Sequence, residues 1–193
     1  LVHFTFDTNE AYMSTKLEKD KTIFLPFNKG DKNSAGNPSN PNGHKTAYIW
    51  EEIFSKTSLA DILQHFVRLD GKDTDKLESR NLYFPRYHQL DVVRKIIDDV
   101  SQNGVGKTYL IQHSAGSGKS NSITWCAYRL IEAYSAKDSM SERPIFDSVI
   151  VVTDRKILDK QLRENIANFS EVKNIIAPAF SSAELKSNLE NGK

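Results

Sequence analysis

Apolar and polar residues follow different patterns in the two halves of the chain. In the first 27 residues, three short groups of aromatic and β-branched residues (1–6, 11–15 and 21–27) predict strands separated by turns. Residues 46–69 change to helical spacing. One expected apolar stripe consists of Tyr48, Ile49, Trp50, Ile53 and Phe54. A capping box from Ser58 to Asp61 predicts the start of a second helix, with an apolar stripe of Leu59, Ile62, Leu63, Phe66 and Val67.

Two polar stretches interrupt this first part. Residues 28–45 contain five Asn, three Gly and two Pro, which favours a solvated connecting loop over a functional one. Residues 70–79 are charged and contain one large apolar residue, Leu77. We therefore divide the chain into a mixed α+β segment, 1–78, and a second domain, 79–193.

The second domain alternates apolar helices with uniformly apolar short segments. A helix with Leu90, Val93, Ile96, Ile97 and Val100 on its buried side ends at Asn103-Gly104. Residues 107–112 and 148–153 predict buried strands, and a helix is expected over 119–134. A helix around Leu162, a weaker strand over 173–179 and a short helix from Ala183 complete the pattern. This alternation predicts an α/β fold with a parallel sheet covered on both faces.

Composition restricts the class of protein but does not identify it. The chain has 193 residues, 38% of them hydrophobic, and a net charge of +1, so charge neither supports nor excludes nucleic-acid binding. Its single cysteine, Cys126, permits no internal disulfide, is expected to be a core residue, and fits a reducing, cytoplasmic location. No apolar run is long enough for a membrane span. The ends, Leu1 without a starting Met and Lys193, suggest part of a longer protein.

The segment from His113 to Ser120, HSAGSGKS, predicts a phosphate-binding loop between a strand and a helix. Gly116 and Gly118 have no Cβ, so main-chain N–H groups can turn inward toward an anion at the helix N-terminus. Lys119 is expected to reach the β and γ phosphates of ATP, and the Ser120 hydroxyl to ligate Mg²⁺. Ser114 and Ser117 complete the predicted cofactor-binding loop. His113 stands where the strict pattern has glycine.

Two further polar groups are candidates for ligand contacts. Gln89, 30 residues before Lys119, follows Arg86 at the start of a helix, where its amide could read the adenine edge and Arg86 could stack on the ring. Thr153 and Arg155 end an apolar strand, where ligands collect in open parallel sheets, and could hold DNA phosphates. A surface helix start and a capped helix with solvated charges are the respective structural alternatives.

The stretches RYHQ (86–89), HSAGSGKS (113–120) and VVTDRKILDKQL (151–162) resemble, in this order, the restriction subunit of type I restriction–modification enzymes. Residues 36–52, GNPSNPNGHKTAYIWEE, resemble the segment of that subunit that joins its endonuclease to its motor. The resemblance implies a superfamily 2 helicase-like, ATP-driven DNA translocase, with residues 79–193 as an incomplete RecA-like P-loop lobe.

The resemblance also implies roles for particular residues. Gln89 and Arg86 match the adenine-reading motif, Lys119 is the catalytic lysine, and Thr153, Arg155 and Gln161 match a motif that contacts the DNA backbone. It further implies double-stranded DNA and the modification and specificity subunits as partners. The acidic Mg²⁺-binding box and the nuclease residues are not found in this sequence. A small P-loop kinase and a nucleotide-binding fold without catalysis are the alternative interpretations.

Overall fold

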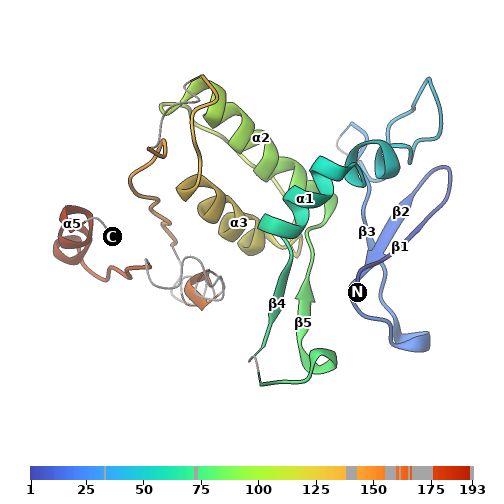
Figure 1. Cartoon of the computed structure of the whole chain (residues 1–193), viewed down its shortest axis with the longest axis horizontal. Helices are drawn as coiled ribbons and strands as arrows, with labels where there is room; N and C mark the ends of the chain where they lie inside the picture. Colours follow the sequence, from blue (N-terminus) through green and yellow to red (C-terminus); the bar gives the residue numbers. More distant parts are fainter. Residues whose placement is uncertain are drawn as a thin grey trace. The chain divides into compact units, whose positions relative to one another are not determined.

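The computed structural model describes residues 1–32, 34–71, 74–137, 143–154, 160, 162–164, 166 and 176–191. The chain divides into two compact units, Leu1–Leu90 and Asp91–Lys193, which we describe separately. Figure 1 labels the regular elements of both units.

The first unit begins with three strands where the apolar groups predicted them, and these strands form an antiparallel sheet. Its strands are β1 (His3–Phe6), β2 (Ala11–Ser14) and β3 (Leu25–Pro26), in the order β1-β2-β3. His3 pairs with Ser14 and Met13 pairs with Leu25. A short 3₁₀ helix, η1 (Lys19–Lys21), lies between β2 and β3.

Aromatic rings form the core of this unit. Phe27 is fully buried, and its ring meets those of Phe4 and Tyr87 edge to face at centroid distances of 5.1 and 5.8 Å. Tyr48 packs against Tyr87 at 5.4 Å and donates a 2.6 Å hydrogen bond to the Phe27 carbonyl oxygen. Burial raises the pKa of the Tyr48 phenol to about 12. Edge-to-face packing of this kind is the favoured geometry of aromatic pairs.

The loop over residues 28–45 is more than a solvated connector, because one of its asparagines is a buried anchor. Asn37 is 5% exposed, and its Oδ1 accepts a 2.8 Å hydrogen bond from the Lys29 N–H. Its Nδ2 donates to the Asn9 carbonyl oxygen and to Asn28 Oδ1, both at 2.9 Å. Composition alone marks such residues as loop formers and does not show which side chain satisfies the buried main chain.

The two helices that follow differ from the predicted ones at their starts. A π-helical segment, η2 (Ile49–Ile53), precedes α1 (Lys56–His65), and Ser55 rather than Ser58 caps α1, its Oγ accepting from the Ser58 N–H at 3.4 Å. Of the predicted stripe, Ile49 and Ile53 are buried, whereas Trp50 is 45% exposed.

The apolar stripe of α1 is correct only in part. Ile62 and Phe66 are fully buried, whereas Leu63 is 65% exposed. After α1, strands β4 (Arg68–Asp70) and β5 (Asn81–Tyr83) form an antiparallel hairpin that the sequence pattern did not predict. The charged stretch between them, which includes the 3₁₀ helix η3 (Leu77–Ser79), is therefore the connection of this hairpin.

In the second unit, two helices pack on each other as their apolar patterns predicted. They are α2 (Tyr87–Asn103), which begins in the first unit, and α3 (Lys119–Ile131). Ile96 and Val100 of α2 form a buried cluster with Ala133, against which Cys126 and Leu130 of α3 pack. Gly104, with φ of 73°, ends α2 as expected, and its N–H donates to the Val100 carbonyl oxygen at 2.7 Å.

The predicted parallel sheet is not formed by the described residues. Residues 107–112 and 148–153 belong to no strand, and both sheets of the described chain are antiparallel. Leu110 is 94% exposed and Val152 is 85% exposed. Apolar runs predict a buried segment, but a strand also needs a neighbour for its hydrogen-bond ladder, and these segments have none among the described residues.

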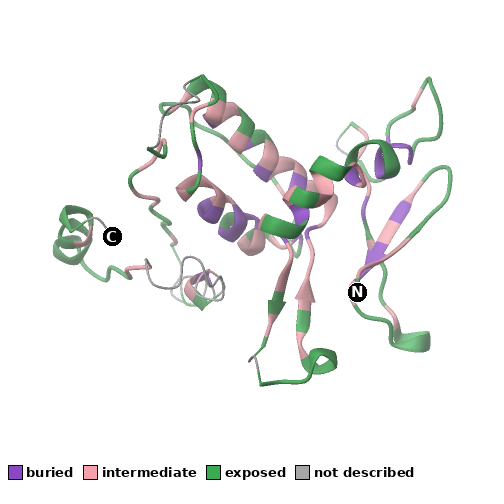
Figure 2. Cartoon of the chain, viewed as in Figure 1, coloured by how far each residue is buried: buried purple, intermediate pink, exposed green. Residues whose placement is uncertain are grey.

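The end of the chain agrees with the sequence pattern in one element. Helix α5 (Ser182–Glu190) begins close to the predicted Ala183 and is exposed along nearly its whole length (Figure 2). The expected helix around Leu162 and the first part of the segment 173–179 lie mostly outside the described residues, and residues 176–179 are in no strand.

Candidate nucleotide-binding site

The glycine-rich loop before α3 has the backbone geometry that an anion-binding turn requires. Gly116 and Gly118 have φ of 72° and 81°, in the left-handed region that residues with a Cβ rarely adopt. A Cβ built on Gly116 would meet nothing within 4 Å, so the protein around it is open at this point. Gly118 is the N-cap of α3, and as a glycine it has no side chain that could cap the helix.

Lys119 folds back over the loop. Its ammonium donates hydrogen bonds to the His113 and Ser114 carbonyl oxygens, at 3.1 and 2.8 Å. The side chain is exposed, so the ammonium can turn from these carbonyl groups toward a bound anion. The lysine therefore lies over the glycine-rich loop, next to the N-terminus of α3.

The serines of the loop differ in their surroundings. Ser117 is buried at 7% exposure, Ser114 is exposed, and Ser120 is half-buried in the first turn of α3. The Ser120 carbonyl oxygen accepts from Thr124 Oγ1 at 2.9 Å, which fixes the first turn of the helix from within. Ser120 itself follows Lys119 directly and is the second residue of α3.

These residues fit a triphosphate tail. The first turn of a helix has N–H groups without an intrahelical acceptor and carries about half a positive charge. In α3 this positive end coincides with the Lys119 ammonium and an open, Cβ-free turn. An anion bound there would be met by main-chain donors and a full positive charge. Ser120 is the loop residue that could add a hydroxyl ligand for Mg²⁺.

His113 is accommodated by turning inward beneath the loop. It is half-buried and lines a cavity of about 420 Å³ together with Lys119, Ser122 and apolar residues of α2 and α3. The same cavity reaches Ile111 and residues 149–152. The imidazole is therefore placed on the inner side of the loop.

The predicted adenine-reading residues lie in the first unit. Gln89 is 3% exposed, and its Oε1 accepts a 2.9 Å hydrogen bond from the Arg86 N–H, so its side chain also secures the start of α2. Arg86 is half-buried one position before that helix. This bond agrees with the structural alternative, a helix start, and the adenine-reading role of Gln89 stays a prediction.

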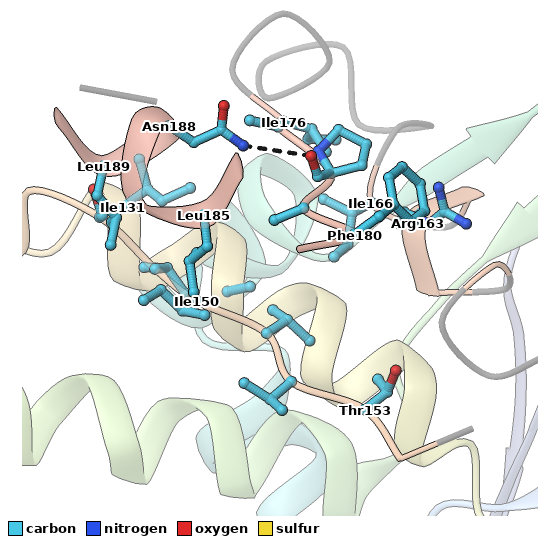
Figure 3. Close-up of a pocket in the computed structure, with 18 of the residues that line it drawn as sticks. Ile131, Ile150, Thr153, Arg163, Ile166, Ile176, Phe180, Leu185, Asn188 and Leu189 are labelled. Carbon is cyan, nitrogen blue, oxygen red and sulfur yellow. Dashed lines mark hydrogen bonds between the residues drawn. The ribbon is translucent and has the colours of Figure 1, made fainter. Parts of the chain in front are cut away.

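Of the two predicted DNA-contacting residues, Thr153 is half-buried, and Arg155 lies outside the described residues, as does Gln161. Thr153 lies at one end of a second cavity, of about 480 Å³, that α3, residues 148–154, residues 176–180 and α5 line (Figure 3). In it the Arg163 guanidinium lies over the Phe180 ring at 5.2 Å, and Asn188 donates to the Pro178 carbonyl oxygen at 3.4 Å. This cavity is apolar over most of its wall.

Comparison with known protein families identifies the class of this domain. Residues 88–193, more than half of the chain, match the family model described as SWI2/SNF2 ATPase. The chain therefore belongs to the SWI2/SNF2 ATPase family, a class of superfamily 2 helicase-like motor that binds ATP. No curated protein and no solved structure gave a match. Among the described residues, no helix has the length and apolar character needed to cross a bilayer.

Proposed function

We propose that this chain is the ATP-binding part of the DNA-translocating restriction subunit of a type I restriction endonuclease. Family membership supports the motor, and the stretches that resemble the restriction subunit, 36–52 and 151–162, support the particular kind of motor. The observation on which the proposal depends is the left-handed glycine turn at the start of α3, over which the Lys119 ammonium folds back.

In this function each loop residue has a distinct task. The N–H groups at the start of α3 hold the β-phosphate, and Lys119 exchanges its carbonyl partners for the β and γ phosphate oxygens. The Ser120 hydroxyl is a ligand of the nucleotide-bound Mg²⁺, an ion that offsets phosphate charge during transfer. Gln89 and Arg86 provide the preference for adenine. Catalysis by such a site is positioning together with charge stabilisation.

Residues 79–193 are in this proposal the first RecA-like lobe of the motor, with Thr153 and Arg155 on the DNA backbone. The nuclease and the remaining motor elements belong to the complete subunit. Its partners are double-stranded DNA and the modification and specificity subunits, in the cytoplasm.

Calorimetric titration with Mg·ATP tests the site. The Lys119→Ala protein should lose at least tenfold in affinity, because it lacks the full positive charge that Lys119 holds over the loop. Lys95→Ala is the matched control, since this lysine is exposed on α2 and pairs with Asp91. Equal ATP affinity in wild type and Lys119→Ala would contradict nucleotide binding at this loop.

A second experiment tests the restriction role. The complete subunit, mixed with modification and specificity subunits, should translocate along double-stranded DNA and cleave it only with ATP. Lys119→Ala should abolish both activities. A complete protein that hydrolyses ATP on DNA but neither associates with these subunits nor cleaves would contradict the type I assignment and leave the motor assignment intact.

A further inference from the structure

Asp99, near the end of α2, is the centre of a polar cluster outside the glycine-rich loop. Its Oδ1 accepts hydrogen bonds from the Lys107 ammonium at 2.6 Å and from Asn103 Nδ2 at 2.7 Å. Its Oδ2 accepts a hydrogen bond from the Tyr109 hydroxyl. One carboxylate therefore ties the last turn of α2 to two residues of the segment 107–112. The sequence gives no periodic signal for this cluster, because a turn with two glycines separates its members.

The chain reverses direction between the helix and this segment. Gly104 and Gly106 have φ of 73° and 103°, and they form the turn after which residues 107–112 run into the glycine-rich loop. Lys107 and Tyr109 are two residues apart, so in extended chain their side chains lie on the same side. Both reach Asp99.

The segment depends on such side-chain contacts for its position. It belongs to no strand in the described chain, so no hydrogen-bond ladder fixes its register. Further along, Ile111 lines the same cavity as Val93 and Ile96 of α2. Apolar contacts of this kind are not directional, whereas hydrogen bonds to a carboxylate have a defined geometry.

The carboxylate is ionised under all ordinary conditions. The hydrogen bonds from Lys107 and then Tyr109 lower the pKa of Asp99 to about 2. The same contact raises the pKa of the Tyr109 phenol. The cluster is therefore an ion pair with two added hydrogen bonds across the physiological range.

We infer that Asp99 is a positioning residue for ATP binding: by fixing Lys107 and Tyr109 on α2, it sets where the segment 107–112 delivers the phosphate-binding loop. This inference rests on the proposed binding of ATP by the loop. Asp99 acts through the backbone that leads to His113 and does not itself contact the nucleotide.

The isosteric change Asp99→Asn removes the charge and keeps the shape. If the loop is then placed correctly in about one fifth of the molecules, the apparent affinity for Mg·ATP falls about fivefold, because apparent affinity scales with the competent fraction. Asp91→Asn is the matched control. Asp91 is on the same helix and pairs with Lys95 at 2.7 Å, but this pair does not involve the segment 107–112. We expect less than about a twofold change there.

Calorimetric titration of the full chain with Mg·ATP measures the affinity of every variant. The melting temperature of each variant shows whether a lost affinity reflects unfolding. Asp99→Glu should recover most of the affinity. Adding Lys107→Met to Asp99→Asn should cause little further loss, because the two substitutions disrupt the same Asp99–Lys107 interaction. Should Asp99→Asn unfold, Lys107→Met and Tyr109→Phe replace it, each with an expected loss of about twofold or more.

Two results would overturn the inference: ATP affinity in Asp99→Asn equal to that of Asp91→Asn, or an Asp99→Glu protein as weak as Asp99→Asn. In the fallback series, wild-type affinity in both Lys107→Met and Tyr109→Phe would do the same. If instead Lys119→Ala binds ATP like wild type, the proposed function itself fails.

Discussion

The conformation of Gly116 allows a quantitative test of the phosphate-binding loop. With φ of 72°, Gly116→Ala must either hold alanine in the left-handed region or change the loop. The left-handed region costs an L-residue about 1–2 kcal/mol. A built Cβ meets no heavy atom within 4 Å, so collision within the protein adds nothing to this cost. If ATP binding requires the observed conformation, affinity should fall about 5- to 30-fold.

Gly36→Ala is the matched control for this experiment. Gly36 has φ of 94°, and a Cβ on it would also meet nothing within 4 Å, but it lies in the first unit, in the loop over residues 28–45. Both variants carry a similar backbone strain, so Gly36→Ala should lower the melting temperature and leave ATP affinity unchanged. Titration calorimetry with Mg·ATP measures the difference. Wild-type affinity in Gly116→Ala, or equal affinity losses in the two variants, would refute the reasoning.

Three further predictions concern stability and reactivity. Phe27→Ala should destabilise the first unit by about 3–5 kcal/mol in urea unfolding, since the ring is fully buried, and a loss under about 1 kcal/mol would contradict the aromatic core. Asn37→Ala should cost about 1–3 kcal/mol in the same assay, because it removes a buried amide that bonds the Lys29 N–H and the Asn9 carbonyl oxygen; an unchanged midpoint would show that water replaces the amide. Burial raises the pKa of the Cys126 thiol from 9.0 to about 11, so a disulfide reagent should modify it slowly at pH 8. As pH rises, the thiol ionises at a lower pH in the unfolded chain than in the folded protein, so the free energy of unfolding should decline between about pH 9 and 11. A thiolate absorbance midpoint near pH 9 in the folded protein would disprove this.

Local signals in the sequence predicted the structure well where neighbouring residues decide it. The strands β1 to β3, the apolar face of α2 and its end at Gly104 follow from periodicity and a glycine stop. The loop before α3 also follows, because Gly116, Gly118 and Lys119 act within a few residues of one another.

Features that depend on distant partners could not be predicted in this way. The hairpin β4–β5 has strands of three residues, which are too short to show a period in the sequence. The anchoring role of Asn37 depends on Asn9 and Asn28, which no spacing rule connects to it. Residues 107–112 and 148–153 have strand composition, but composition does not supply the neighbouring strand that a ladder needs.

The most direct test of the account is where Mg·ATP binds on the chain. In ¹⁵N-labelled protein, titration with Mg·ATP should shift the main-chain amide signals of residues 113–121 most strongly, with Gly116, Gly118 and Lys119 among the largest changes. Lys119→Ala should abolish these shifts at the same nucleotide concentration. Shifts that are absent from residues 113–121, or that concentrate elsewhere and persist in Lys119→Ala, would contradict the assignment of this loop as the nucleotide-binding site.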